Sequence, residues 1–123
     1  MDLGNFSVSL SVKDLAASRD FYEKLGFETY MDFATEGWVI VRNATATVGL
    51  FQGMFEGNLL TFNPGWDRDA NELLSFMDAH KILVILRAKG LVIENEAAET
   101  AEGPASFMVT DPDGNRIPVD QHV

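Results

Sequence analysis

The sequence predicts an α+β fold of two β-α-β-β-β modules within a single domain, residues 1–123. Three observations support this prediction. An alternating strand pattern at residues 6–12 leads directly into a capped amphipathic helix. A dense β-branched run follows at 38–42. Two predicted helices each end at a glycine, Gly26 and Gly90, and the 64 positions between them are close to half the length of the chain. The modules are therefore expected to be pseudo-repeats that span 5–52 and 58–121, duplicated in pattern rather than in identity.

The first module opens with a strand and a helix. In residues 6–12, apolar side chains alternate with serines, so one face of the strand is apolar and the other carries hydroxyl groups. Asp14 is a favourable helix N-cap, because its carboxylate can accept hydrogen bonds from the free N–H groups of the first turn. An apolar stripe at helical spacing follows, and Gly26 supplies the left-handed residue that commonly ends a helix. We therefore predict a helix between Asp14 and Gly26.

Three more strands complete the first module. They are expected at 27–33, 38–42 and 45–51, joined by a turn at 34–37 and a hairpin turn at 43–44. Gly49 lies inside the last strand, and a glycine in a strand interior often marks a bulge or a close approach by another group. Glycines on either side of a Met-Phe pair in 52–57 indicate a connector between the modules.

The second module repeats this order. We predict a strand at 59–63, a loop at 66–76 that can contain a short helix, and a helix at 79–89 with Asp78 as N-cap. Strands at 91–95, 106–110 and 116–119 follow, separated by an acidic loop at 96–103 and an Asp-Pro-Asp-Gly-Asn turn at 111–115. The two modules are expected to form a curved mixed sheet whose polar or mixed inner face leaves a cup-shaped pocket.

Composition narrows the class of function. Acidic residues outnumber basic ones by 19 to 9, for a formal charge of −10, which disfavours nucleic acid as a partner because phosphates require a basic surface. An acidic surface either provides solubility or attracts a cationic ligand. Because the chain has no cysteine, thiol nucleophiles and thiolate metal sites are excluded. No apolar run reaches the ~18 residues of a membrane span, and no signal-peptide pattern is present, so a cytoplasmic location and no membrane partner are expected.

Two stretches, SLSVKDLAASRDFYEKLGFE and TDPDGNRI, resemble the superfamily of glyoxalase I, bleomycin-resistance proteins and extradiol dioxygenases, the vicinal oxygen chelate proteins. The resemblance covers nearly the whole chain. It implies two modules whose curved sheets surround a pocket, commonly completed by a second subunit. In catalytic members it also implies a divalent metal ion, held by side chains on the inward faces of four strands.

Other residue types stand where the resemblance puts those metal ligands. A His, a carboxylate or Gln, a second His and a Glu are expected, and the corresponding positions are Ser7, Gly49, Leu59 and Pro118, with Phe51 and Asn58 as neighbouring alternatives. First-row metal ions prefer imidazole or carboxylate donors. Neither a metal ion nor another cofactor is therefore expected.

The strand alternation instead predicts a cup lined by hydroxyls, an amide, aromatic rings and a few charges. Such a mixture suits an amphipathic or aromatic small molecule, a cationic one included. The predicted ligand-binding residues are Ser7, Ser9, Trp38, Arg42, Thr47, Phe51, Thr61, Asn63, Arg116 and Asp120. The serines either line the cup or form an exposed face, and Trp38 either packs in the core or stacks on a ligand. No catalytic residue is assigned.

The predicted function is metal-free binding or sequestration of a small molecule. The alternative is a divalent-metal-dependent lyase, isomerase or dioxygenase with a displaced metal site, and a third possibility is an interaction module with a vestigial pocket. Of the two histidines, His80 is expected at a solvated surface, and His122 forms an Asp-x-His pair with Asp120 that is either a solvated tail or part of the cup. A homodimer is expected, because such modules leave sheet edges and an apolar sheet face for a partner to cover.

Overall fold

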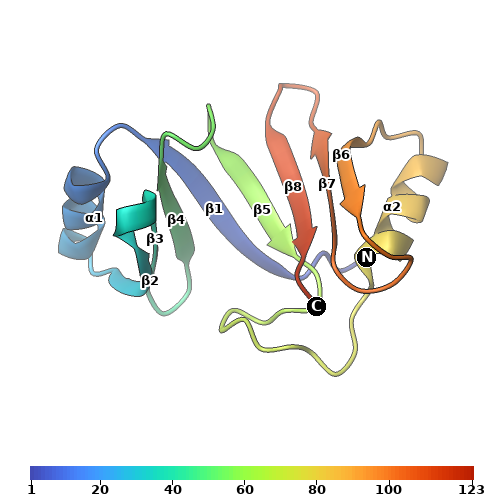
Figure 1. The fold of residues 1–123 in the computed structure, drawn as a ribbon, viewed down its shortest axis with the longest axis horizontal. Coiled ribbons are helices and arrows are strands. Elements are labelled where there is room, and N and C mark those ends of the chain that lie inside the picture. Colours follow the sequence, from blue (N-terminus) through green and yellow to red (C-terminus); the bar gives the residue numbers. More distant parts are fainter. The chain divides into compact units, whose positions relative to one another are not determined.

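The computed structural model describes every residue, Met1–Val123, and confirms the α+β class. The chain forms two compact units whose elements are drawn in Figure 1. The N-terminal unit is Ser7–Leu59, and the C-terminal unit combines Met1–Phe6 with Leu60–Val123. None of the helices has both the length and the apolar character that a membrane crossing requires.

The N-terminal unit consists of one helix on a four-stranded mixed sheet. The strand order is β2 (Glu28–Phe33), β3 (Trp38–Arg42), β4 (Thr47–Gln52), β1 (Asn5–Val12). β1 runs parallel to β4, and the other neighbours are antiparallel. Helix α1 (Leu15–Lys24) lies against the sheet beside β2, β3 and β4 (Figure 1). A short 3-10 helix, η1 (Ala34–Glu36), joins β2 to β3.

The capping prediction for α1 is confirmed. The Asp14 carboxylate accepts a hydrogen bond from the Ala17 N–H at 3.1 Å, and Gly26 after the helix has a φ of +99°. Beneath α1, Leu15 packs with residues of β3 and β4 in a core cluster of Leu15, Val39, Val41 and Leu50. Local capping and apolar burial therefore specify the same helix.

The C-terminal unit places α2 (Ala79–Ala88) against a second group of strands. Their order is β5 (Leu59–Asn63), β8 (Arg116–Gln121), β7 (Ala105–Thr110), β6 (Glu94–Ala98). β6, β7 and β8 are antiparallel neighbours. The core consists of Ala79, Ile82, Leu83, Leu86, Phe107 and Val119. Leu3, from the start of the chain, packs against this core.

In each unit, a glutamine at the end of a strand binds the first backbone N–H of the helix. Gln52 Oε1 accepts from Leu15 N at 2.8 Å, and Gln121 Oε1 accepts from Ala79 N at 2.6 Å. The first N–H groups of a helix have no partner within the helix, so each glutamine satisfies one of them. Gln121 is only 2% exposed. Its amide nitrogen also donates to the Asp78 carboxylate and to two backbone carbonyls, at 2.8 to 3.0 Å.

Several predicted boundaries are wrong. The strand predicted at 91–95 is irregular as far as Ile93, and β6 instead runs Glu94–Ala98, which shortens the predicted acidic loop. The apolar residues that suggested that strand, Leu91 and Val92, are 46% and 76% exposed. The loop at 66–76 contains no helix, only a bridge between Trp66 and Glu72. β4 starts at Thr47 and includes Gln52, and β8 extends to Gln121; the side chains of both glutamines bind a helix.

Two turns of the C-terminal unit share one hydrogen-bond pattern. Asp67 and Asp111 each accept, with Oδ1, from the backbone N–H groups two and four residues later, at 2.8 to 2.9 Å. The residue before the last of these donors has a positive φ in both turns, +59° at Ala70 and +88° at Gly114. Ala70 therefore adopts a conformation that costs an L-residue energy and a glycine almost none.

Replacing Gly114 by alanine should lower the free energy of unfolding by about 1 kcal/mol, because the left-handed conformation disfavours a Cβ by roughly that amount. No other atom lies within 4 Å of that Cβ, so the backbone is the only source of strain. Ala70→Gly should raise the free energy of unfolding by about 0.5 kcal/mol. The strain that glycine relieves in the folded state is expected to outweigh the stability lost because glycine adds conformational entropy to the unfolded chain. Urea unfolding followed by circular dichroism measures both, and effects of the same sign would contradict the shared-turn interpretation.

Candidate ligand-binding face

The predicted binding residues of the N-terminal unit lie on the sheet face opposite α1. Val39, Val41 and Leu50 are 0% exposed and pack beneath α1. Side chains alternate along a strand, so their neighbours project from the other face. We call this surface the binding face; strand alternation and the registers assign to it Ser7, Ser9, Ser11, Glu28, Met31, Phe33, Trp38, Ile40, Arg42, Thr47, Gly49 and Phe51.

Aromatic rings form a row across the binding face. Phe33 stands opposite Trp38, and Trp38 opposite Phe51, in the strand registers. The ring centroids are 4.4 and 5.8 Å apart, and the rings are tilted by only 14° and 15°. Phe55 extends the row at 5.3 Å from Phe51. The Ser11 hydroxyl donates to the Phe55 carbonyl at 2.8 Å and fixes that residue in place. We call these four rings the aromatic row.

The ring of Phe51 covers Gly49. A Cβ on Gly49 would lie 2.5 Å from Phe51 Cε2, closer than atoms can pack, and 3.2 Å from Ile40 Cδ1, a tight contact. The close approach expected at this glycine is therefore present, and the approaching group is an aromatic ring. Because Trp38 and Phe55 flank that ring, Phe51 cannot turn aside without opening the aromatic row.

A second and a third row lie farther along the strands. Met31, Ile40, Gly49 and Ser9 are aligned across the sheet next to the aromatic row. Beyond them, the guanidinium carbon of Arg42 lies 3.7 Å from the centroid of the Tyr30 ring. Thr47 and Glu28 stand opposite Arg42 on the two neighbouring strands. The binding face thus has an aromatic row, an apolar row and an end that carries Arg42 with Glu28 and Thr47 beside it.

The residues at the four expected metal-ligand positions do not fit a metal ion. A hydroxyl is a weak ligand for first-row metals, and Gly, Leu and Pro side chains offer no donor. At Gly49 the volume that a ligating side chain would need is filled by the Phe51 ring. No group of three or more His, Asp or Glu side chains is arranged to hold a metal ion.

The other four predicted binding residues belong to the C-terminal unit. Arg116 and Asp120 alternate along β8 with Val119, which is buried beneath α2, so they project from the face opposite α2. The Asn63 amide is largely buried and donates to the Asp120 backbone carbonyl at 2.8 Å, so it joins β5 to β8. Thr61 lies two residues before it on β5.

The histidines are more constrained than the sequence suggests. His122 Nε2 lies 3.2 Å from Asp120 Oδ2, and its ring stacks on Trp66 with centroids 4.5 Å apart. The hydrogen bond to Asp120 raises the pKa of His122 above its usual value, against the opposing effect of burial. His80 is half-buried rather than fully solvated, and its Nε2 lies 3.2 Å from the Gly103 carbonyl oxygen.

Asp120→Asn should return the pKa of His122 toward its usual value, because the hydrogen bond and charge of Asp120 raise it. The ion pair stabilises the fold fully below the unfolded-state pKa of about 6.5, and this contribution is lost as pH rises through the raised folded-state pKa. Both side chains are nearly half exposed, 47% and 44%, so the effect on the free energy of unfolding is below about 1 kcal/mol. An NMR titration of the His122 ring in both proteins measures the shift, and identical midpoints would contradict it.

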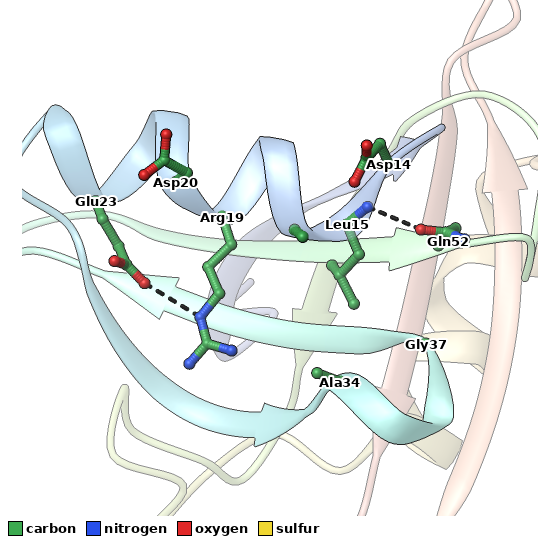
Figure 2. Close-up of a pocket in the computed structure, with 9 residues that line it drawn as sticks. Asp14, Leu15, Arg19, Asp20, Glu23, Ala34, Gly37 and Gln52 are labelled. Atoms are coloured by element: carbon green, nitrogen blue, oxygen red, sulfur yellow. Dashed lines mark hydrogen bonds and ion pairs between the residues drawn. The ribbon is translucent and has the colours of Figure 1, made fainter.

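A separate groove of about 450 Å³ lies on the α1 side of the N-terminal unit (Figure 2). Sequence patterns did not indicate it. Its charged groups already have partners: Arg19 pairs with Glu23 at 3.1 Å and with Asp32 at 3.0 Å, and Asp20 pairs with Lys24 at 2.8 Å. The pKa of Asp32 lies below its usual value, because the Ala34 N–H and Arg19 donate hydrogen bonds to it. Because these charged side chains are already paired, the groove is a weaker candidate ligand site than the binding face.

The paired β-α-β-β-β order, with a helix on one face of each group of strands, defines a class of proteins that share this architecture around diverse sites. A family model described as Glyoxalase/Bleomycin resistance protein/Dioxygenase superfamily matches residues 6–119. The chain therefore belongs to this superfamily, as the resemblance implied. No curated protein matches the sequence.

Three solved structures support the fold. A superfamily member from Vibrio splendidus 12B01 is 19% identical, with 95% of this chain and 97% of that chain covered and a TM-score of 0.65. A protein described as NAD-dependent benzaldehyde dehydrogenase from Legionella pneumophila is 18% identical over 97% and 100% of the chains, with a TM-score of 0.69. A variant of methylmalonyl-CoA epimerase from Streptomyces coelicolor is 15% identical over 99% of both chains, with a TM-score of 0.61. At these identities the likeness concerns the fold alone.

Proposed function

We propose that this protein binds or sequesters a planar aromatic or amphipathic small molecule on the binding face, without a metal ion. The observation that carries the proposal is the Phe51 ring over Gly49. At the position where the resemblance implies a metal ligand, this chain packs an aromatic surface. That exchange favours dispersion and apolar contact over metal coordination as the source of affinity.

The binding face offers the contacts that an aromatic ligand needs. Met31 and Ile40 provide an apolar row, and the aromatic row borders it. Phe33 is 43% exposed, so ring surface remains open to a ligand. Each aromatic contact contributes about 0.5–1.5 kcal/mol beyond the area that it buries. The serine and threonine hydroxyls on β1 and β4 add hydrogen-bonding groups that can fix the ligand's orientation.

A thermal-shift screen with planar aromatic compounds tests this proposal. For compounds that raise the melting temperature, Phe33→Ala should weaken binding about tenfold, the loss of roughly 1.4 kcal/mol of contact, as measured by titration calorimetry. Phe21→Ala is the matched control, because Phe21 is 58% exposed on α1, away from the binding face. Flat melting curves throughout, or equal weakening by both variants, would count against the proposal.

The alternative function, a metal-dependent lyase, isomerase or dioxygenase with a displaced site, has one observation in its favour. Asp120 and His122 form an ion pair of two side chains that can ligate metals. Metal analysis of protein purified without a tag distinguishes the two functions. Stoichiometric zinc, nickel, manganese or iron that is lost in His122→Ala would favour the alternative.

We also propose that the protein is a homodimer. β2 and β6 each have a single neighbouring strand, so each leaves a row of backbone groups that a second chain can pair with. Analytical ultracentrifugation tests the proposal. A single species at the monomer mass of 13.6 kDa across micromolar concentrations would contradict it.

A further inference from the structure

We infer that the ligand of the binding face is an aromatic anion, such as an aryl carboxylate, sulfonate or phosphate, and that Arg42 binds its charged group. This inference rests on the proposed function and specifies the ligand class. It runs against the simplest interpretation of the overall charge of −10, which favours a cationic ligand.

The first argument is the charge on the face itself. Arg42 is the one cationic side chain that the strand registers assign to the binding face. The two basic residues of α1 lie on the other side of the sheet, where Arg19 is bound to Glu23 and Asp32 and Lys24 to Asp20. Glu28 stands opposite Arg42 on the edge strand β2 and is exposed. On the inner side, toward β4, the neighbour of Arg42 is the hydroxyl-bearing Thr47, so an anion approaching from the apolar row meets a cation and a hydroxyl.

The second argument is geometric. Trp38, Ile40 and Arg42 are alternate residues of one strand, and a strand rises about 3.4 Å per residue. Arg42 therefore lies about 13 Å from the aromatic row, with Ile40 halfway between. A flat ring system resting on Ile40 and Met31 would touch the aromatic row at one end. Its other end would come within reach of the long Arg42 side chain.

The third argument is that Arg42 is held ready for this contact. Its guanidinium lies over the Tyr30 ring at 3.7 Å. This contact restricts the Arg42 side chain before a ligand binds, so less conformational entropy is lost on binding. A guanidinium carries five N–H donors in a planar fork that matches the geometry of a carboxylate, sulfonate or phosphate. It can therefore bind an oxyanion in addition to its partners within the protein.

The affinity for an anion depends more on its contact with Arg42 than on the net charge of the protein, because distant charges are screened. At physiological salt, charges farther apart than about 8 Å are largely screened from each other. Within the N-terminal unit, Asp20, Glu23 and Asp32 lie on the α1 side and are paired with Arg19 or Lys24. The net charge of the protein slows the association of an anion, whereas direct contact with Arg42 sets the affinity. A charge-assisted hydrogen bond is worth about 10- to 100-fold in affinity.

The experiment compares three ligands with one ring system and different charges. Naphthalene-2-carboxylate, naphthalene-2-carboxamide and 2-naphthylmethylammonium are titrated into the full-length protein by calorimetry at physiological salt. The carboxylate should bind at least about tenfold more tightly than the amide, and the ammonium should bind most weakly. Equal affinities, or tightest binding of the ammonium, would overturn the inference and leave the proposed function standing. No binding by any of the three would overturn both.

Arg42→Gln identifies the residue responsible. This variant should lose the preference for carboxylate over amide and keep its affinity for the amide. Lys24→Gln is the matched control, because it removes one positive charge from an exposed position on α1, where Lys24 pairs with Asp20. Loss of the preference in both variants, or in neither, would refute the role of Arg42. The retained amide affinity reports that the variant is folded.

Discussion

Replacing Gln121 by alanine is expected to lower the free energy of unfolding by about 3 kcal/mol, because a buried polar hub would be lost. Gln121 is 2% exposed and makes four hydrogen bonds. Its removal leaves the Ala79 N–H without a partner at the first turn of α2, and also frees the cap residue Asp78. Each unsatisfied buried group costs about 1–3 kcal/mol, and the groups nearest the surface recover part of this by binding water.

Gln52→Ala is the matched control for this prediction. Gln52 holds the corresponding place beneath α1 but is exposed and makes one hydrogen bond to the helix, at 2.8 Å. Water can replace that bond, so a loss of about 1 kcal/mol is expected. Chemical denaturation of the two variants measures the difference. Equal losses would show that the network around Gln121 contributes no more than a single capping hydrogen bond.

Gly49→Ala is expected to lower the free energy of unfolding by about 2 kcal/mol, the cost of forcing an extra carbon into a filled space. The new Cβ would lie 2.5 Å from the Phe51 ring. Gly49 is not among the residues of positive φ, so its backbone accepts alanine and the cost arises from the contact alone. Alanine favours a strand over glycine at such a position, so a destabilising result is diagnostic of the collision.

A double-mutant cycle isolates this contact. With Phe51 already replaced by alanine, the Gly49→Ala substitution should cost less than about 0.5 kcal/mol, because the obstructing ring is gone. Urea denaturation of the wild type, both single variants and the double variant gives the coupling energy. Additive effects of the two substitutions would contradict the packing that underlies the proposed function.

The N-terminal unit was the more predictable half, because its local signals agree. Asp14 caps α1, Gly26 ends it, and the β-branched run from Trp38 to Arg42 forms β3 with the predicted bounds. The alternation also placed Trp38 and Arg42 on a shared face, which the core beneath α1 confirms. These features depend on periods of two and 3.6 residues, which a sequence displays directly.

Features that depend on contacts between distant residues could not be predicted in this way. Phe33 is not among the predicted site residues. Its role depends on the stack of its ring on Trp38, which forms across η1, the short helix that brings the two strands together. The turn of four residues between these two aromatic residues was the available signal. The strand at 91–95 failed for the opposite reason: its apolar residues suggested burial, yet Leu91 and Val92 remain exposed. Composition alone does not determine which apolar run is covered.

The first six residues belong to the C-terminal unit, with Leu3 on the α2 core and the Phe6 ring 5.0 Å from the ring of Phe62. The segment Ser7–Leu59 is contiguous, so the whole N-terminal unit leaves the ribosome before most of the C-terminal unit. The amino-terminal hexapeptide must wait for most of the remaining chain before it finds its place. A fusion partner attached to Met1, which is 58% exposed, would therefore sit on the half of the protein that is translated last.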